Sequence, residues 1–238
     1  MVTYFYAPPS AFRGAYVTLP PDEAAHARKV LRTRAGDTIV VVDGQGGWYQ
    51  VAVDVAEPEH LAGQLVASEQ EHGEPSYQLT LAVGLLKQRS RWETLLEKCT
   101  ELGVHAILPL TTDHGEKATL RRDRCERVLV AAMKQSKRSR LPALYDPLPA
   151  VEALRQQADA PGLIATMDAP AKAHPLAALR DCSAGPLTAF IGPEAGFSAD
   201  ERSEAQALGY VPVSLGRRRL RAETAAITMT AACALAFP

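Results

Sequence analysis

The sequence predicts an α/β protein of two domains, a small β-rich domain over residues 1–72 and a strand–helix domain over residues 73–238. A chain of 238 residues has room for one large domain or two modest ones. Its 47% hydrophobic and 22% charged residues are typical of a globular protein with a core. The hydrophobic pattern changes at residues 68–76, a polar stretch with Gly and Pro that indicates a linker.

Strand patterns dominate the first domain. Residues 38–42 form a β-branched run that ends in Asp43-Gly44, a turn signal, and residues 48–55 alternate apolar and polar side chains. Together they predict a hairpin with a longer loop. Residues 21–34 predict a short helix on which Arg28 and Arg32, four residues apart, share one face.

Strands and helices alternate in the second domain, which predicts a parallel sheet with helices on its faces. The predicted strands cover residues 79–86, 105–110, 163–167, 187–191 and 211–215. The predicted helices cover residues 91–102, 120–135, 198–209 and 223–237. Ser198 and Glu201 have the spacing of a capping box. The last helix is apolar nearly all round, which predicts that it is buried.

The net charge of −1, from 26 basic and 27 acidic residues, argues at first against a nucleic-acid partner. The charge is unevenly distributed, however, because residues 1–74 carry −5 and residues 75–238 carry +4. Residues 114–140 hold nine basic and three acidic side chains. Phosphate binding depends on local contacts, so these basic runs fit an RNA partner. A solvated helix face or loop is the simpler alternative for each run.

Several classes of protein are not expected. No run of about 18 apolar residues predicts a membrane span, and the N-terminus lacks the pattern of a signal peptide. Four scattered cysteines and six histidines show no metal-ligand spacing, so we expect no metal site. These patterns favour a cytoplasmic protein.

Two loops follow predicted strands, where α/β proteins commonly bind ligands. The first, residues 191–197, reads IGPEAGF. It matches neither the dinucleotide-binding nor the P-loop motif, and a tight strand-to-helix turn is its simpler interpretation. The second, residues 215–225, reads LGRRRLRAETA. Helix capping explains Glu223 and Thr224, whereas four clustered arginines favour an anionic ligand such as RNA phosphate.

These motifs together resemble the RsmE family, bacterial methyltransferases of the SPOUT class that modify N3 of a uridine (uracil 1498) in 16S ribosomal RNA. The resemblance covers nearly the whole chain. It is carried by His26 to Arg32, Asp43-Gly44, Lys87 to Gly103, Gln135 to Pro142, and above all the segments IGPEAGFSADE at 191–201 and LGRRRLRAETA at 215–225.

The resemblance implies a PUA-like RNA-binding β-barrel for residues 1–72. For residues 73–238 it implies a SPOUT methyltransferase domain with a deep trefoil knot. It further implies S-adenosylmethionine as cofactor, 16S ribosomal RNA in the small subunit as partner, and a homodimer.

Three groups of site residues are carried over by motif. We expect Arg221 to stabilise the anion that develops on the base, and we consider Glu223 as a general base, or more simply as an arginine partner or helix cap. The expected RNA contacts are His26, Arg28, Arg32, Arg138, Arg140 and Arg219. The expected cofactor pocket comprises Thr166, Met167, Ile191, Gly192, Pro193, Glu194, Gly196, Leu215, Gly216, Leu220 and Ala225.

Three residues depart from the family pattern, one of them Lys134, which stands where a glutamate usually precedes the Gln135-Ser136 pair. Ala195 stands where glycine is usual, and it would be strained if that position needs a positive φ. Arg219 replaces an aliphatic residue and is expected either to point to solvent or to contact RNA. Two alternative functions stay open: a SPOUT enzyme with another RNA target, such as a ribose 2′-hydroxyl, and a non-catalytic RNA-binding or ribosome-assembly protein.

Overall fold

The computed structural model of the protein describes residues 3–115, 118–167, 173–180 and 182–237. The chain divides into two compact units. Unit 1 comprises Met1–Glu74 and Val130–Leu141, and unit 2 comprises Pro75–Leu129 and Pro142–Pro238. Unit 1 therefore includes a segment that the sequence analysis assigned to the second domain, and the limits 1–72 and 73–238 stay a prediction.

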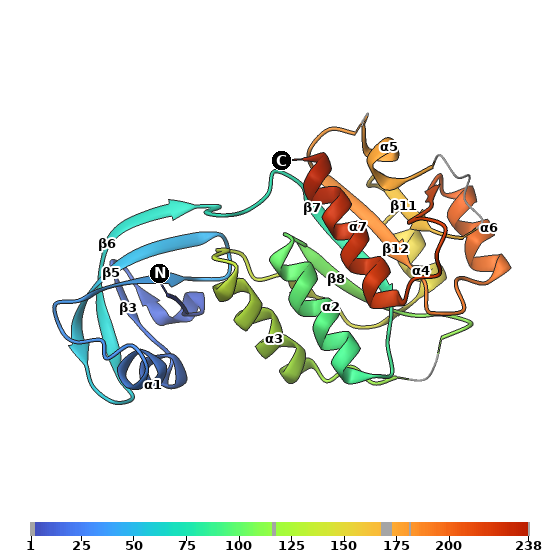
Figure 1. The fold of residues 1–238 in the computed structure, drawn as a ribbon. Helices are drawn as coiled ribbons and strands as arrows, with labels where there is room; N and C mark the ends of the chain where they lie inside the picture. The colour runs from blue at the N-terminus through green and yellow to red at the C-terminus, as the bar shows by residue number, and fades with distance from the viewer. Residues whose placement is uncertain (1–2, 116–117, 168–172, 181, 238) are drawn as a thin grey trace. The chain divides into compact units, whose positions relative to one another are not determined.

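Unit 1 is built on a curled six-stranded sheet in the order β1-β4-β5-β6-β3-β2 (Figure 1). Its elements are β1 (Tyr4–Tyr6), η1 (Pro9–Ala11), β2 (Phe12–Arg13), β3 (Tyr16–Thr18), α1 (Pro21–Lys29), β4 (Thr38–Val42), β5 (Gly47–Ala56) and β6 (Leu61–Gln70). The predicted hairpin is confirmed, since β4 and β5 pair antiparallel with Val42 opposite Trp48. The core of unit 1 contains Phe5, Val41 and Val51, all at most 1% exposed.

Two predicted boundaries in unit 1 are wrong. Helix α1 ends at Lys29 because Arg32 has a φ of 56°, a left-handed conformation that stops a helix. Strand β6 continues to Gln70, so the linker predicted over 68–76 begins as sheet. Its later residue Glu74 accepts hydrogen bonds from the Arg138 guanidinium, 2.6 Å at the shortest, and from the backbone N–H groups of Ser139 and Arg140. This stretch therefore anchors the 130–141 segment.

Unit 2 is a parallel sheet in the order β10-β8-β7-β12-β11-β13, with β9 paired to β8. The parallel pairing predicted from strand–helix alternation is confirmed. Its strands are β7 (Gln78–Gly84), β8 (Ala106–Thr111), β9 (Ala143–Leu144), β10 (Leu148–Pro149), β11 (Gly162–Ala165), β12 (Pro186–Ile191) and β13 (Val211–Val213). Buried Leu81, Ala82 and Phe190 are among the residues that form its apolar centre.

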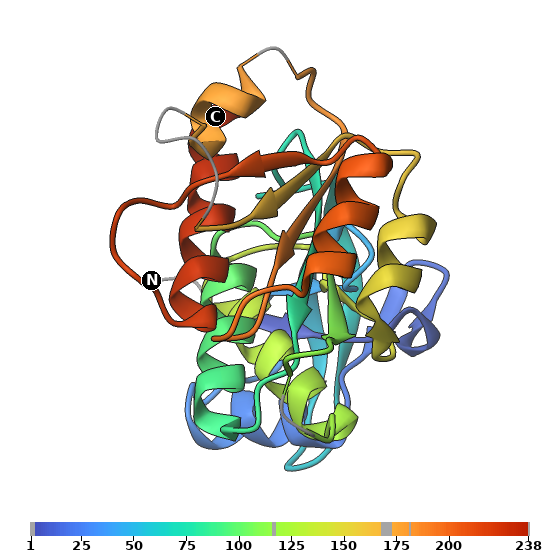
Figure 2. The same ribbon diagram turned by 90° about the vertical axis from the view of Figure 1, so that its right-hand side faces the viewer.

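Helices cover both faces of this sheet. The helices that follow β7 in the chain are α2 (Arg89–Glu101), α3 (Arg122–Gln135), α4 (Ala150–Gln156), α5 (Pro175–Leu179), α6 (Ala199–Ala207) and α7 (Ala222–Ala236). Figure 2 shows α2 and α7 on one face and α4 and α6 on the other. The prediction that α7 is buried all round is wrong, because Leu235 is 72% exposed although Met229 and Cys233 are buried. Within the described residues, no helix combines the length and apolarity needed to cross a membrane.

Candidate active site

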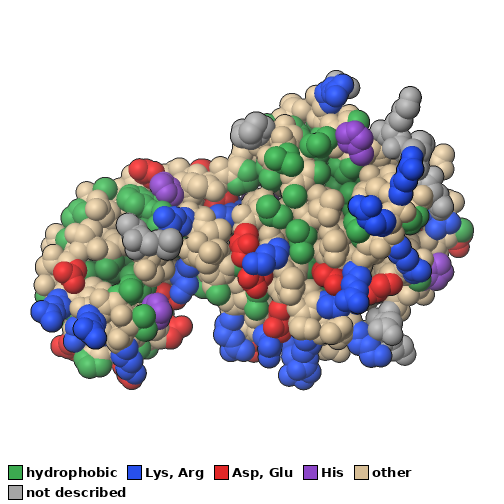
Figure 3. Space-filling view, viewed as in Figure 1, with side chains coloured by type: hydrophobic (Ala, Val, Ile, Leu, Met, Phe, Trp, Pro, Cys, Tyr) green, Lys and Arg blue, Asp and Glu red, His purple; other side chains and the backbone are tan. Residues whose placement is uncertain are grey.

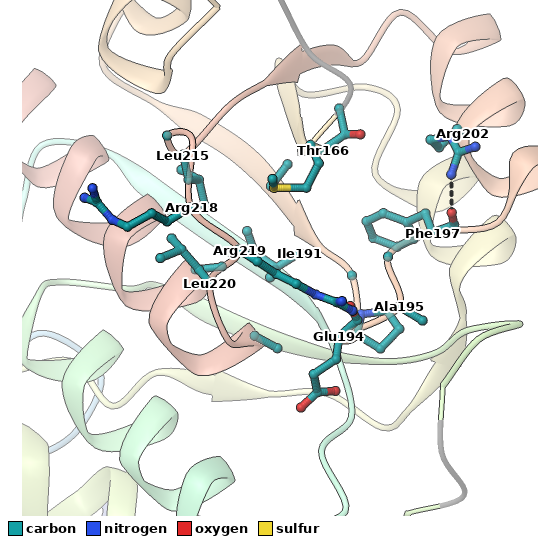
Figure 4. A pocket seen from close by; sticks show the side chains of 18 residues that line it. Thr166, Ile191, Glu194, Ala195, Phe197, Arg202, Leu215, Arg218, Arg219 and Leu220 are labelled. Atoms are coloured by element: carbon teal, nitrogen blue, oxygen red, sulfur yellow. Dashed lines mark hydrogen bonds between the residues drawn. The ribbon is translucent and has the colours of Figure 1, made fainter. Parts of the chain in front are cut away.

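A cavity of about 420 Å³ lies where β11, β12 and β13 end. Its walls are the segment after β11, the 191–197 loop, the 215–220 loop and the first turn of α7. Figure 4 shows these side chains converging from separate loops. Parallel strands place their carboxyl ends at one edge of the sheet, which explains why loops distant in sequence meet here.

All eleven residues expected to bind the cofactor line this cavity: Thr166, Met167, Ile191, Gly192, Pro193, Glu194, Gly196, Leu215, Gly216, Leu220 and Ala225. Phe197, Arg202 and Arg218 also line the cavity, although the sequence motifs did not predict them as cofactor contacts. The structure thus brings the two motif loops together, while the binding role of each residue stays a prediction.

The 191–197 loop has a tight path that its glycines permit. Gly196 has a φ of 77°, which favours glycine, and its N–H donates to the Pro193 carbonyl at 2.8 Å. A Cβ on Gly192 would lie 3.2 Å from the Phe197 ring and backbone. The predicted capping box is confirmed, because Ser198 and Glu201 hydrogen-bond reciprocally at the start of α6. The loop is therefore held at both ends, by β12 and by the helix cap.

Ala195 fits this loop without backbone strain. It is exposed and is not among the residues with a positive φ. The departure from glycine therefore adds only a methyl group at the cavity edge.

Arg91, in the first turn of α2, organises the site and was missed by the sequence analysis. Its Nε and Nη2 atoms donate to the two carboxylate oxygens of Glu223 at 2.8 and 2.5 Å. Its Nη1 atom donates to Glu194 Oε1 at 2.6 Å. The Arg91 side chain is 19% exposed and that of Glu223 is 11% exposed. One guanidinium thus joins the 191–197 loop to the start of α7.

These ion pairs fix the charge of both acids. Burial raises the pKa of Glu223, but the hydrogen bonds from Arg91 and from its own backbone N–H, together with the positive charges of Arg91 and Arg221, lower it further in sum, so its pKa lies below the ordinary value. The pKa of Glu194 is also lowered, by its own backbone N–H and by Arg91. The hydrogen bonds that Arg91 donates to Glu223 raise the pKa of Arg91. A carboxylate held in this way is a weak proton acceptor, and Glu223 has the arginine partner that was its simpler interpretation.

The arginines between β13 and α7 take different positions. Arg219 extends along the cavity and donates to the Glu194 carbonyl oxygen at 2.5 Å (Figure 4). It therefore links the two motif loops, a role that neither expectation for it included. Arg221 is exposed at the N-cap of α7, outside the set of residues that line the cavity.

Three expected RNA contacts lie at the end of α1 in unit 1. His26 and Arg32 are exposed, and half-buried Arg28 donates to the Thr33 carbonyl at 2.6 Å. Val30, 63% exposed, lies between them in the chain. This end of α1 offers cationic and apolar side chains together, and its binding of RNA stays a prediction.

The expectation for Arg138 does not fit its position. Its side chain and that of Glu74 are both 4% exposed and form an ion pair. The guanidinium has no surface to offer an RNA, so we do not carry Arg138 forward as a contact. Arg140 pairs with Glu71 and keeps 29% of its side chain exposed. Among the described residues, no group of three or more His, Cys, Asp or Glu side chains is arranged to hold a metal ion.

Comparisons with known proteins agree with this architecture. Residues 73–234 match the RNA methyltransferase domain family, and residues 19–66 match the RNA methyltransferase PUA domain family. The chain is 34% identical to ribosomal RNA small subunit methyltransferase E of Synechocystis, over 89% of this chain and 70% of that protein. It is 28% identical to the protein of the same name from Mycobacterium tuberculosis, over 93% of this chain and 87% of that protein.

A solved structure has the same fold. The crystal structure of ribosomal RNA small subunit methyltransferase E from Neisseria gonorrhoeae, bound to S-adenosylmethionine, matches with a TM-score of 0.85 and 28% identity, covering 100% of this chain and 98% of that one. Fold, cavity and domain matches define an RNA methyltransferase with a PUA domain. Within that class, the chain belongs to the ribosomal RNA small subunit methyltransferase E family.

Proposed function

We propose that this protein transfers a methyl group from S-adenosylmethionine to N3 of one uridine, uracil 1498, of 16S ribosomal RNA in the small ribosomal subunit. The observation that carries the proposal is the cavity in which the 191–197 and 215–225 loops, the family's two strongest motifs, converge. Because its substrate would be ribosomal RNA, we place the reaction in the cytoplasm.

The cavity suits the proposed cofactor. Its volume of about 420 Å³ lies within the roughly 300–1,000 Å³ of small-molecule sites. Ile191, Leu215 and Leu220 give it apolar walls for an aromatic base. Gly192 and Gly216 expose backbone without a side chain, which permits close approach of a ligand. When bound, S-adenosylmethionine supplies a methyl group activated by a sulfonium sulfur.

The protein's own contribution is to place the base and to stabilise charge. Uracil N3 carries a proton that must leave, and donors near O2 or O4 favour the anion that results. Arg221 is exposed within the 215–225 motif, and its guanidinium has five N–H donors for this role. Glu223 is less suited to accept the proton because Arg91 occupies both of its carboxylate oxygens. We therefore assign anion stabilisation to Arg221 and a positioning role to Glu223.

We further propose the trefoil knot and the homodimer that the family resemblance implies. Strand β13 lies at the sheet edge beyond β11, whereas the following helix α7 packs back on β7 and β12. This return across the sheet is consistent with a chain that threads a loop. Hydrophobic side chains gather over α7 in Figure 3, and Leu235 is 72% exposed, so a second copy would find an apolar surface there.

The test is methylation of small subunits that lack the modification, with radiolabelled S-adenosylmethionine and mass-spectrometric mapping of the product. Methyl at N3 of the predicted uridine supports the proposal. A 2′-O-methylated nucleoside would replace it with another SPOUT activity. Calorimetry that detects no S-adenosylmethionine binding would instead indicate a non-catalytic RNA-binding protein.

A further inference from the structure

A second cavity, of about 460 Å³, lies beside the first in unit 2. It is lined by Leu85, Leu86, Lys87, Gln88, Arg91, His114, Pro193, Glu194 and Ala195. We propose that this second cavity receives the target nucleotide of the substrate RNA, with the base inserted and its phosphate at the rim. The inference rests on the proposed function and adds to it the place where the substrate binds.

The position of the second cavity suits a methyl acceptor. It opens where β7 and β8 end, next to the end of β12, so it shares the functional edge of the sheet. Pro193, Glu194 and Ala195 line both cavities. A ligand in each would therefore meet the same three residues. Methyl transfer needs the two reacting atoms about 3–3.5 Å apart and aligned, which only adjacent sites provide.

The side chains of the second cavity match a pyrimidine nucleotide. Leu85 and Leu86, each 7% exposed, offer apolar surface for the ring. The amide of exposed Gln88 has both donors and acceptors, and it makes no side-chain capping bond to α2. Such an amide can donate to O2 or O4 of uracil and leave N3 free to face the methyl group. Single bases of RNA are commonly recognised by this combination of apolar contact and hydrogen bonds to the pairing edge.

A lysine and a histidine stand at the rim of the second cavity. Lys87 and His114 are exposed and come from different segments, the end of β7 and the loop after β8. Lysine is a common phosphate ligand, and phosphate contacts set the position of a nucleic acid. The volume of about 460 Å³ suits one nucleotide rather than a helix. The target would therefore leave its stack, as N3 chemistry requires, because N3 lies on the pairing edge.

The walls of the second cavity are held in place before RNA arrives. Ser198 donates its hydroxyl to Asp113 Oδ2 at 2.7 Å, and the Asp113 N–H donates to Glu201 at 3.1 Å. These bonds tie the loop that carries His114 to the start of α6. Gly84 allows β7 to approach the 191–197 loop, since a Cβ there would lie 2.9 Å from Pro193 N. Such preorganisation favours a binding site over a transient surface hollow.

Two variants test the second cavity without touching the first. Gln88→Trp would fill it, and Lys87→Glu would reverse the charge at its rim; neither residue lines the first cavity. We expect kcat/KM for small subunits to fall at least tenfold in each, with the Kd for S-adenosylmethionine within twofold and Tm unchanged. The matched control is Arg155→Glu on α4, which makes the same kind of charge reversal outside both cavities and should retain kcat/KM.

The outcomes separate this inference from the proposed function. If the unaltered protein fails to methylate small subunits, the proposed function falls and the inference with it. If it methylates them while Gln88→Trp and Lys87→Glu both keep kcat/KM within twofold, the inference alone is overturned. Cross-linking to small subunits that contain 4-thiouridine gives a direct readout. Attachment within residues 85–91 or at His114 supports the second cavity, and attachment confined to other peptides contradicts it.

Discussion

Replacing Arg91 with methionine should destabilise the protein at neutral pH and weaken cofactor binding. The change leaves Glu223, whose side chain is 11% exposed, without its cation. A hydrogen bond to a charged group contributes about 1.5–3 kcal/mol, and partial exposure lowers the value, so we expect the two bonds to Glu223 to contribute about 3 kcal/mol together. Glu194 is 48% exposed, and its pair adds little. For a chain of this size, Tm should fall by roughly 6–12 °C.

The pH dependence checks the cause. The pKa of Glu223 is lowered in the folded protein, so the pair stabilises it fully above the ordinary value of 4.5 and less as pH falls through the folded pKa. The Tm difference between the two proteins should thus be large at pH 7 and shrink below pH 4.5. Calorimetric scans at several pH values measure it, with Arg124→Met, which removes an exposed surface pair, as control. This reasoning would be refuted if the unaltered protein and Arg91→Met had the same Tm at pH 7, or if their Tm difference stayed constant down to pH 3.

Three further outcomes are expected. Arg221→Ala should reduce methyl transfer by about a hundredfold or more, the loss typical of one oxyanion donor, while calorimetry shows an unchanged Kd for S-adenosylmethionine; an equal loss of affinity would move Arg221 into the cofactor site. Gly192→Val should abolish binding of S-adenosylmethionine, because a Cβ there already lies 3.2 Å from Phe197; retained affinity would contradict that site. Glu74→Ala should lower the unfolding free energy by about 3–5 kcal/mol in denaturant titration, since it removes the buried carboxylate that pairs with the Arg138 guanidinium; a loss under about 1 kcal/mol would contradict this role of Glu74.

Local patterns predicted the parts of the fold that local chemistry determines. The β-branched run at 38–42 became β4 with the same limits, and Ser198 and Glu201 cap α6 as their spacing indicated. Several of the missed elements are short, although the ten-residue strand β6 and the seven-residue helix α4 were also missed. Strands β1 and β3 have three residues each and β2 has two, too few to show an alternating pattern. β1 pairs with β4 and β3 with β6, strands that are distant in the sequence, and β2 pairs with β3, so pairing rather than their own composition forms them.

Long-range partners account for what the sequence could not reveal. Arg91 lies 132 residues from Glu223 and 103 from Glu194, so no spacing rule connects them. The basic run at 114–140 fitted an RNA surface, yet several of its members pair with distant acids. Arg122 pairs with Asp146, Arg124 with Glu93, Lys134 with Glu23, Arg138 with Glu74, and Arg140 with Glu71. These five basic residues therefore form ion pairs within the fold more than they form a phosphate-binding surface.

Because these basic residues are paired with acids, the segment between β13 and α7 must supply the positive charge that attracts RNA. Arg91, Glu194 and Glu223 together carry one more negative than positive charge, which by itself repels both a phosphate and an anionic uracil. The four arginines of residues 217–221 reverse that sign. Arg218 and Arg219 line the first cavity, and Arg221 stands at the helix start that Glu223 helps to hold. The acids thus position the loops, and the nearby arginines make the site attractive to RNA although the whole chain carries a net charge of −1.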